Sequence, residues 1–201
     1  MIAITIVAFV VAIVLPRINN NDNKTKAIIR KLSTLSRELR FRAKLQNATY
    51  RLVFDMETDD NDHPVDSYWV EKGNGNILND YNPKSPPKNP AKLAQQRKAA
   101  KKNDEKLPPP RFAMDTSIMR KPIVFPSKLI LKSVELSNLD EPVTKGVVYI
   151  HFLPSGFADE AAIHLKLGHS KWTLVTRPFT GQMVILPEDK SLNDLMEQER
   201  R

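Results

Sequence analysis

The feature that most constrains this chain is its first fifteen residues, which carry no charge and whose one polar side chain is Thr5. Pro16 follows directly, and the sequence after it is largely polar. As a helix rising about 1.5 Å per residue, the run spans roughly 22 Å, less than the roughly 30 Å hydrocarbon core of a bilayer. No basic residue precedes it and no small-residue cleavage site follows it, unlike a secretory signal. The sequence therefore predicts a polar body tethered by, or assembled through, an apolar N-terminal helix.

Composition limits what the body can be. The chain has 201 residues, which suits one domain with attachments, and it contains no cysteine. A disulfide framework and a thiolate metal site are thereby excluded. The formal net charge is +8, and residues 83–110 carry most of it, with eight Lys or Arg against two acidic residues. This basic segment also holds seven of the 15 prolines and few large apolar residues, so we expect a mobile insertion.

The basic segment admits other interpretations. Basic runs occur in nucleic-acid-binding proteins, but no aromatic residue is interleaved here for base stacking. The pattern favours a solvated loop, and no nucleic-acid partner is expected. Contact with anionic lipid headgroups is a third interpretation, since each Lys or Arg near such a surface contributes roughly 1 kcal/mol.

The residues after Pro16 predict an amphipathic helix. Asn23 is a suitable N-cap, and apolar residues then recur at spacings of three and four. They are Ile28, Leu32, Leu35, Leu39 and Ala43, of which the four largest are expected to pack on the rest of the body. Arg40 and Lys44 lie toward the polar side, where replacement by Asp is predicted to be nearly silent for folding.

From Thr49 onward the apolar spacing changes to two, which is typical of strands. Candidate strands cover residues 49–56, 68–70, 129–136, 147–153, 161–167, 172–176 and 182–186. Tight turns join the last three, which predicts an antiparallel meander. The polar residues 191–201 predict an exposed, flexible tail. The predicted fold class is α+β, a long N-terminal helix with a membrane half and an amphipathic half, packed on an antiparallel β-sheet head.

No catalytic constellation emerges from the sequence. The histidines are His63, His151, His164 and His169, and each is predicted to face solvent from a loop, a turn or the polar side of a strand. No His-x-x-x-His or Glu-x-x-His spacing indicates zinc, and the Gly-x-Ser-x-Gly of a nucleophile elbow is absent. We therefore expect neither an enzyme nor a cofactor.

A run of acidic residues is the one candidate metal site. Its members are Asp55, Glu57, Asp59, Asp60 and Asp62. Their hard oxygens could bind calcium, but the run lacks the Gly and closing Glu of an EF-hand. A solvated acidic loop is the favoured interpretation.

Residues 2–16, Ile-Ala-Ile-Thr-Ile-Val-Ala-Phe-Val-Val-Ala-Ile-Val-Leu-Pro, resemble the N-terminal helix of type IV pilins and type II secretion pseudopilins. That family's mature helix begins Phe-Thr-Leu-Ile-Glu, continues as an Ile/Val/Ala/Leu run and carries a proline where Pro16 lies. By this alignment a basic leader and about six mature residues would precede Met1, and restoring them gives a span of about 20 residues.

Two further stretches resemble the H-type minor pseudopilins (GspH/FimT-like). Residues 32–44, followed by Tyr-Arg-Leu-Val-Phe-Asp at 50–55, are similar to that group's passage from helix to first strand. Phe-Leu-Pro-Ser-Gly at 152–156 and Trp-Thr-Leu-Val at 172–175, then Thr-Gly at 180–181, are similar to its closing strands. Residues 83–128 have no counterpart in the resemblance.

The resemblance implies a domain plan. Residues 1–16 would form a transmembrane and filament-core helix, 17–48 an amphipathic spine, 49–190 the head with its insertion at 83–110, and 191–201 the tail. The residues of the assembly helix would be Ile2, Ile6, Phe9, Val10, Ile13 and Pro16.

The resemblance also implies a structural role, that of a minor pseudopilin of a type II secretion pseudopilus. Expected partners are other pilin or pseudopilin subunits, inner-membrane lipid and the prepilin peptidase, with prepilin methylation during maturation. The expected location is the inner membrane, in a single pass with the head in the periplasm. Basic residues after the run, such as Arg17 and Lys24, would by themselves favour a cytoplasmic head, whereas the family's basic leader favours the opposite.

Two alternatives stay open from the sequence. One is a minor pilin of a type IV pilus, and the other is a membrane-tethered periplasmic binding module unrelated to filaments. Codons upstream of Met1 would discriminate, because a basic leader ending in Gly before Phe-x-x-x-Glu supports the filament family.

Overall fold

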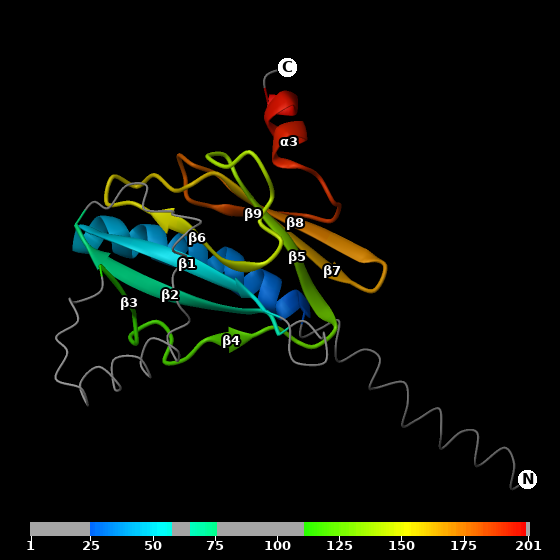
Figure 1. Cartoon of the computed structure of the whole chain (residues 1–201). Coiled ribbons are helices and arrows are strands. Elements are labelled where there is room, and N and C mark those ends of the chain that lie inside the picture. The colour runs from blue at the N-terminus through cyan, green and yellow to red at the C-terminus, as the bar shows by residue number, and fades with distance from the viewer. Residues whose placement is uncertain (1–24, 58–64, 76–110, 200–201) are drawn as a thin grey trace, which may run out of the picture.

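A computed structural model describes residues 25–57, 65–75 and 111–199 (Figure 1). Within these ranges the chain is α+β, and both of its sheets are antiparallel, which confirms the predicted class. The predicted assembly helix and the basic segment 83–110 lie outside them, as do His63, Asp59, Asp60 and Asp62. Among the described residues, no helix combines the length and the apolar character needed to cross a membrane.

The described chain begins with a helix over residues 25–46 and continues into strands. The strands are β1 (Ala48–Met56), β2 (Ser67–Asn74), β3 (Phe112–Met114), β4 (Ile123–Val124), β5 (Leu129–Leu136), β6 (Gly146–Phe152), β7 (Ala161–Leu167), β8 (Ser170–Thr176) and β9 (Met183–Leu186). The first sheet has the order β3-β2-β1-β6, with β4 also paired to β2, and the second has the order β5-β7-β8-β9. The predicted meander is confirmed as β7-β8-β9.

Three elements depart from the sequence expectation. Strands β3 and β4 have three and two residues, too few to leave a periodic signal. The predicted flexible tail is wrong, because Leu192–Glu199 forms helix α3. Its Leu192 is buried against Ala162 and Val175, so a few well-spaced apolar residues suffice to attach an otherwise polar helix.

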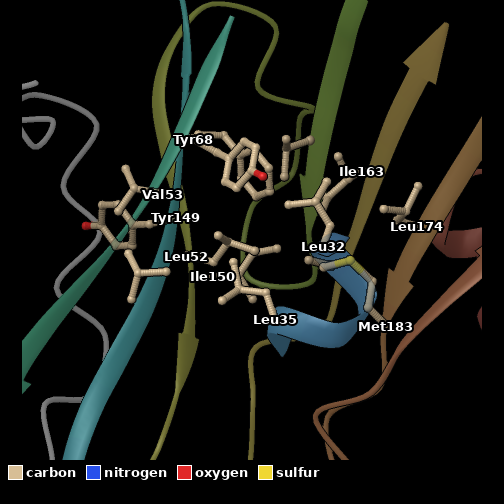
Figure 2. Close-up of a cluster of buried hydrophobic side chains, with 14 of the residues drawn as sticks. Leu32, Leu35, Leu52, Val53, Tyr68, Tyr149, Ile150, Ile163, Leu174 and Met183 are labelled. Atoms are coloured by element: carbon tan, nitrogen blue, oxygen red, sulfur yellow. The ribbon is translucent and has the colours of Figure 1, made fainter. Parts of the chain in front are cut away.

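Helix and sheets share one hydrophobic core. Leu32 and Leu39 of the helix are completely buried and belong to the same cluster as residues of both sheets. Figure 2 shows Leu32 and Leu35 close to Leu52 and Ile150 of the first sheet and to Ile163, Leu174 and Met183 of the second. Ile28, the first residue of the predicted stripe, is only partly buried. Since each buried Leu contributes about 1.5–3 kcal/mol, this helix is a principal source of stability.

Side chains from outside the sheets bind three edge strands. Ser33 Oγ donates to the Met183 carbonyl of β9 at 2.8 Å, and Met183 N donates to Ser36 Oγ at 3.2 Å. Leu131 N of β5 donates to Asp66 Oδ2 at 2.8 Å, and His151 N of β6 donates to Asp159 Oδ2 at 2.9 Å. Unpaired backbone N–H and C=O groups on an edge strand can pair with a strand of another molecule, so these bonds limit edge-to-edge association.

One sequence prediction about the helix is wrong. Arg40 was expected to be a dispensable polar residue, yet its Nε donates to the Gly156 carbonyl at 2.9 Å. Gly181 lies against the same side chain, with φ +60 and room for no Cβ, since an added Cβ would lie 2.7 Å from Arg40 Cδ. Arg40 therefore joins the helix to two loops of the head.

Candidate functional site

The outer face of the first sheet carries a buried ion pair. Arg51 of β1 lies opposite Glu71 of β2, with Nη2 2.6 Å and Nε 2.7 Å from Glu71 Oε2. Trp69 Nε1 donates to the other carboxylate oxygen at 2.8 Å. The Arg51 guanidinium carbon lies 4.0 Å from the ring centroid of Phe112 and 4.5 Å from that of Tyr149. We name these five residues the Arg51 cluster.

The Arg51 cluster is built for stability. Every charged group in it faces an opposite charge or an aromatic ring, as buried charges require. Both charged residues and all three aromatic residues are buried, which leaves no exposed member to meet a ligand. β1 is buried along all nine residues, so its polar side chains do not face water.

His151 belongs to the same face, and its predicted solvent exposure is wrong. The side chain is buried, and its Nδ1 lies 2.7 Å from Asp159 Oδ2. Its ring packs edge-on against Tyr149, with centroids 5.0 Å apart. The loop after β6 returns along that strand and covers the face that alternation alone assigned to solvent.

His164 marks a second polar cluster, on the outer face of the second sheet, and its predicted exposure is also wrong. It is buried on β7, with Nδ1 2.8 Å from Asp189 Oδ1 and Nε2 3.0 Å from Glu135 Oε1. A carboxylate oxygen therefore lies beside each ring nitrogen of His164. Lys132 and Lys171 approach Asp189 Oδ2 at 3.1 and 3.2 Å. We name these five residues the His164 clamp.

The His164 clamp attaches the C-terminal segment to the sheet. Glu135 Oε2 accepts from Leu192 N at 2.7 Å, in the first turn of α3. Thr173 of β8 adds two bonds, donating to the Glu188 carbonyl and accepting from Lys190 N. The pKa of Asp189 is lowered to about 2, chiefly because Lys132 donates to it, and His164 and Lys171 act in the same direction against partial desolvation.

Exposed apolar side chains gather near the C-terminal end of helix 25–46. Phe157 and Phe179 come from two loops, and their rings meet edge-on with centroids 5.5 Å apart. Arg40, which bonds Gly156, links that pair to the helix. Phe41 and Leu45 lie one turn apart on the helix's outward side, 66% and 70% exposed. We name Phe41, Leu45, Phe157 and Phe179 the aromatic surface.

The aromatic surface is suited to binding rather than to bond-making chemistry. Large apolar groups that stay exposed beside cations such as Arg40 and Lys44 are typical of protein contact sites. The sequence carries a signal for this surface, since Phe157 and Phe179 each follow a turn-forming Gly or Pro. Bulky aromatic residues in such turns contribute little to a core.

The described part of the chain holds no group of three or more metal-ligating side chains. Of the calcium candidates, Asp55 is buried within β1, paired in register with Ser67, and Glu57 follows that strand. Asp55 thus lies in the strand predicted over 49–56, and its burial there, rather than the solvated setting expected for the acidic run, is the difference. His169 is exposed in the β7–β8 turn, as predicted.

Comparison with known proteins gives no relative, since no family model, curated protein or solved structure matches the chain.

Proposed function

We propose that the chain is a minor pseudopilin, a structural subunit of a type II secretion pseudopilus rather than an enzyme. Its apolar run would continue into helix 25–46 as one long spine, with a membrane half and an amphipathic half, and the sheets would form its head. The subunit would sit in the inner membrane in a single pass with the head in the periplasm. The prepilin peptidase would process it before it joins other subunits.

The observation that carries this proposal is the shared core of helix and sheets. Residues 25–46 follow the apolar run closely in sequence, and their Leu32 and Leu39 are completely buried with residues of both sheets. A helix attached in this way moves with the head as one body. A flexible tether needs no such attachment, whereas a filament subunit needs it to hold its head in register with its neighbours.

The aromatic surface would supply the contact with those neighbours. If the helix is continuous, 25 residues at about 1.5 Å each place Phe41 roughly 37 Å beyond Pro16. That distance is too great for contact with the bilayer that holds the run, so a protein neighbour is the expected occupant.

The experiment that tests the proposal is site-specific photo-crosslinking in cells that carry the assembly machinery. A benzophenone amino acid at Phe41 should cross-link to another pilin-like subunit only when the assembly ATPase is active. The same probe at Lys166, exposed on β7, is the matched control. Cross-links that do not depend on the ATPase, or none at all, would count against a filament subunit.

Orientation has a test of its own. Alkaline phosphatase fused to the C-terminus should be active, because that enzyme matures only in the periplasm, and β-galactosidase fused at the same point should be inactive. The reverse pair of activities would place the head in the cytoplasm and remove the pseudopilin assignment.

Two alternatives remain beside the main proposal. A minor pilin of a type IV pilus would share every residue argument, and neighbouring genes would distinguish it. A membrane-tethered periplasmic binding module is favoured by one observation, that the aromatic surface offers an apolar site whether or not a filament forms. It predicts photo-crosslinks that are independent of the ATPase.

A further inference from the structure

A groove runs between α3 and the loop that follows β5. Its volume is about 360 Å³, and Leu136, Leu139 and Met196 contribute apolar lining. Glu135, Asp140 and Glu141 supply carboxylates around it. Asp140 and Glu141 are exposed, and neither forms an ion pair with another described residue. The groove therefore combines an apolar lining with negative charge that is not neutralised locally.

The surroundings strengthen this negative charge. Helix α3, with the sequence Leu-Asn-Asp-Leu-Met-Glu-Gln-Glu, has no basic residue, and its Asp194 and Glu197 are exposed. Among the described residues, Glu135 is the only one of the three groove carboxylates with a basic side chain in ion-pair range, since His164 Nε2 lies 3.0 Å from it. A chain with a net charge of +8 thus keeps a concentrated acidic surface at one place.

The sequence contains a segment with the complementary chemistry. Residues 92–102 read Lys-Leu-Ala-Gln-Gln-Arg-Lys-Ala-Ala-Lys-Lys, which joins five cations to the apolar Leu93 and three alanines. The segment lies between β2 and β3, which pair as neighbours through Gly73 and Phe112 in the first sheet. Helix α3 rises from the opposite side of the head (Figure 1).

We propose that this groove binds residues 92–102 of a second copy of the chain. The apolar Leu93 would meet the apolar lining, and the lysines would meet Asp140 and Glu141. Because the donor segment and the acceptor groove are different parts of one chain, the contact is heterologous rather than isologous. Such a contact leaves one groove and one segment free at the ends, so copies can add in series.

This contact is independent of the pseudopilin proposal, since a tethered module with the same groove would associate in the same way. It uses neither the aromatic surface nor the apolar run. Failure of the photo-crosslinking at Phe41 therefore leaves it standing, and its own failure leaves the pseudopilin proposal standing.

The test is an exchange of charge between two copies of the full chain in detergent, followed by sedimentation velocity. One variant reverses the charge of the groove with Asp140→Lys and Glu141→Lys. The other reverses the charge of the segment with Lys98→Glu, Lys101→Glu and Lys102→Glu. We expect each variant alone to lose the salt-sensitive self-association of the parent chain. Loss of two exposed ion pairs should weaken association by roughly fivefold or more. An equimolar mixture should recover it, because each variant then meets an opposite charge.

The matched control reverses two exposed lysines elsewhere, Lys121→Glu and Lys128→Glu, and should associate like the parent chain. Both groove substitutions are at exposed positions, and far-ultraviolet circular dichroism will show that the fold is retained. The proposal is overturned if the mixture stays dissociated, if the single variants associate like the parent, or if the parent is monomeric. If the segment instead binds the groove of its own chain, the parent will be monomeric.

Discussion

The outer faces of the two sheets both carry clusters of charged residues, but the two clusters differ in how deeply they are buried. In the Arg51 cluster both members of the ion pair are buried, and rings of the same sheet enclose them. In the His164 clamp the histidine is buried, but Lys132 and Lys171 are about half exposed. Arg51 is covered by the Phe112 and Tyr149 rings of its own sheet, whereas His164 is covered by a segment that arrives after β9. How firmly a polar cluster is shielded from solvent therefore depends on which element covers it, and not on its residue types.

Arg51→Met should produce the largest loss of stability, because it removes the ion pair of the Arg51 cluster on the first sheet. It leaves Glu71 as a buried charge without its cation, which costs about 3–5 kcal/mol in the free energy of unfolding. Urea unfolding followed by tryptophan fluorescence measures it. Arg51→Met combined with Glu71→Leu should recover most of that loss, because no charge is then left buried. If the double variant is no more stable than the single one, the cluster does not act as an ion pair.

His164→Gln should have a smaller effect, confined to the second face. Glutamine has one nitrogen in place of the two ring nitrogens that lie beside Asp189 and Glu135, and a hydrogen bond to a charged group contributes about 1.5–3 kcal/mol. Amide hydrogen exchange should accelerate in α3 while β1 stays protected. Lys166→Gln, at an exposed position on the same strand, is the control. Equal acceleration in both regions would show that the two faces are not independent.

Acid titration should separate two carboxylates by the sign of their effect. The pKa of Asp189 is lowered to about 2 from 3.8, so its contribution to stability is complete above about pH 4 and is lost as pH falls through 2. The pKa of Asp66 is raised by burial, partly offset by its bond from Leu131 N, so its ionisation lowers stability as pH rises above 3.8.

The matching variants are Lys132→Gln and Asp66→Asn, examined by urea unfolding at pH 2 to 7. Lys132→Gln should flatten the rise in stability between pH 2 and 4. Asp66→Asn keeps an acceptor for Leu131 N and should make the chain more stable near pH 7 than the parent. Parallel pH profiles for parent and variants would contradict both assignments.

Tyr68→Phe should have the smallest effect and tests the region between the two faces. Tyr68 lies in the shared core, its ring 5.4 Å from that of Phe125, and its hydroxyl has no hydrogen-bond partner among the described residues. Burial raises its pKa to about 12. Removing the hydroxyl should leave the free energy of unfolding unchanged or raise it by up to about 1 kcal/mol, measured by urea unfolding. A clear loss of stability would reveal a partner for the hydroxyl.

Periodicity in the sequence predicted what depends on neighbouring residues. The spacing of Leu32, Leu35 and Leu39 identified a buried helix face, and the alternation in 161–186 identified the meander. Each pattern depends only on residues of a single helix or strand, where the face of a residue follows from its position along that element.

Periodicity failed where a distant segment decides the environment. Alternation correctly separates the two faces of β7, but it cannot show that Asp189 returns to cover His164. The same limit applies to His151, which the loop containing Asp159 covers. The aromatic surface was missed for the opposite reason, because an apolar residue in a turn carries no periodic signal at all.

The bonds between helix 25–46 and the head have a mechanical consequence. Ser33 and Ser36 hold β9, Arg40 holds the loop at Gly156, and Arg42 Nη1 donates to Ser117 Oγ at 3.2 Å. A force applied along the helix axis loads these attachments in parallel, so they resist together in shear. A force on the C-terminus instead loads the attachments of α3 one after another and peels it away. The molecule is thus strong when driven through its helix and weak when pulled from its tail.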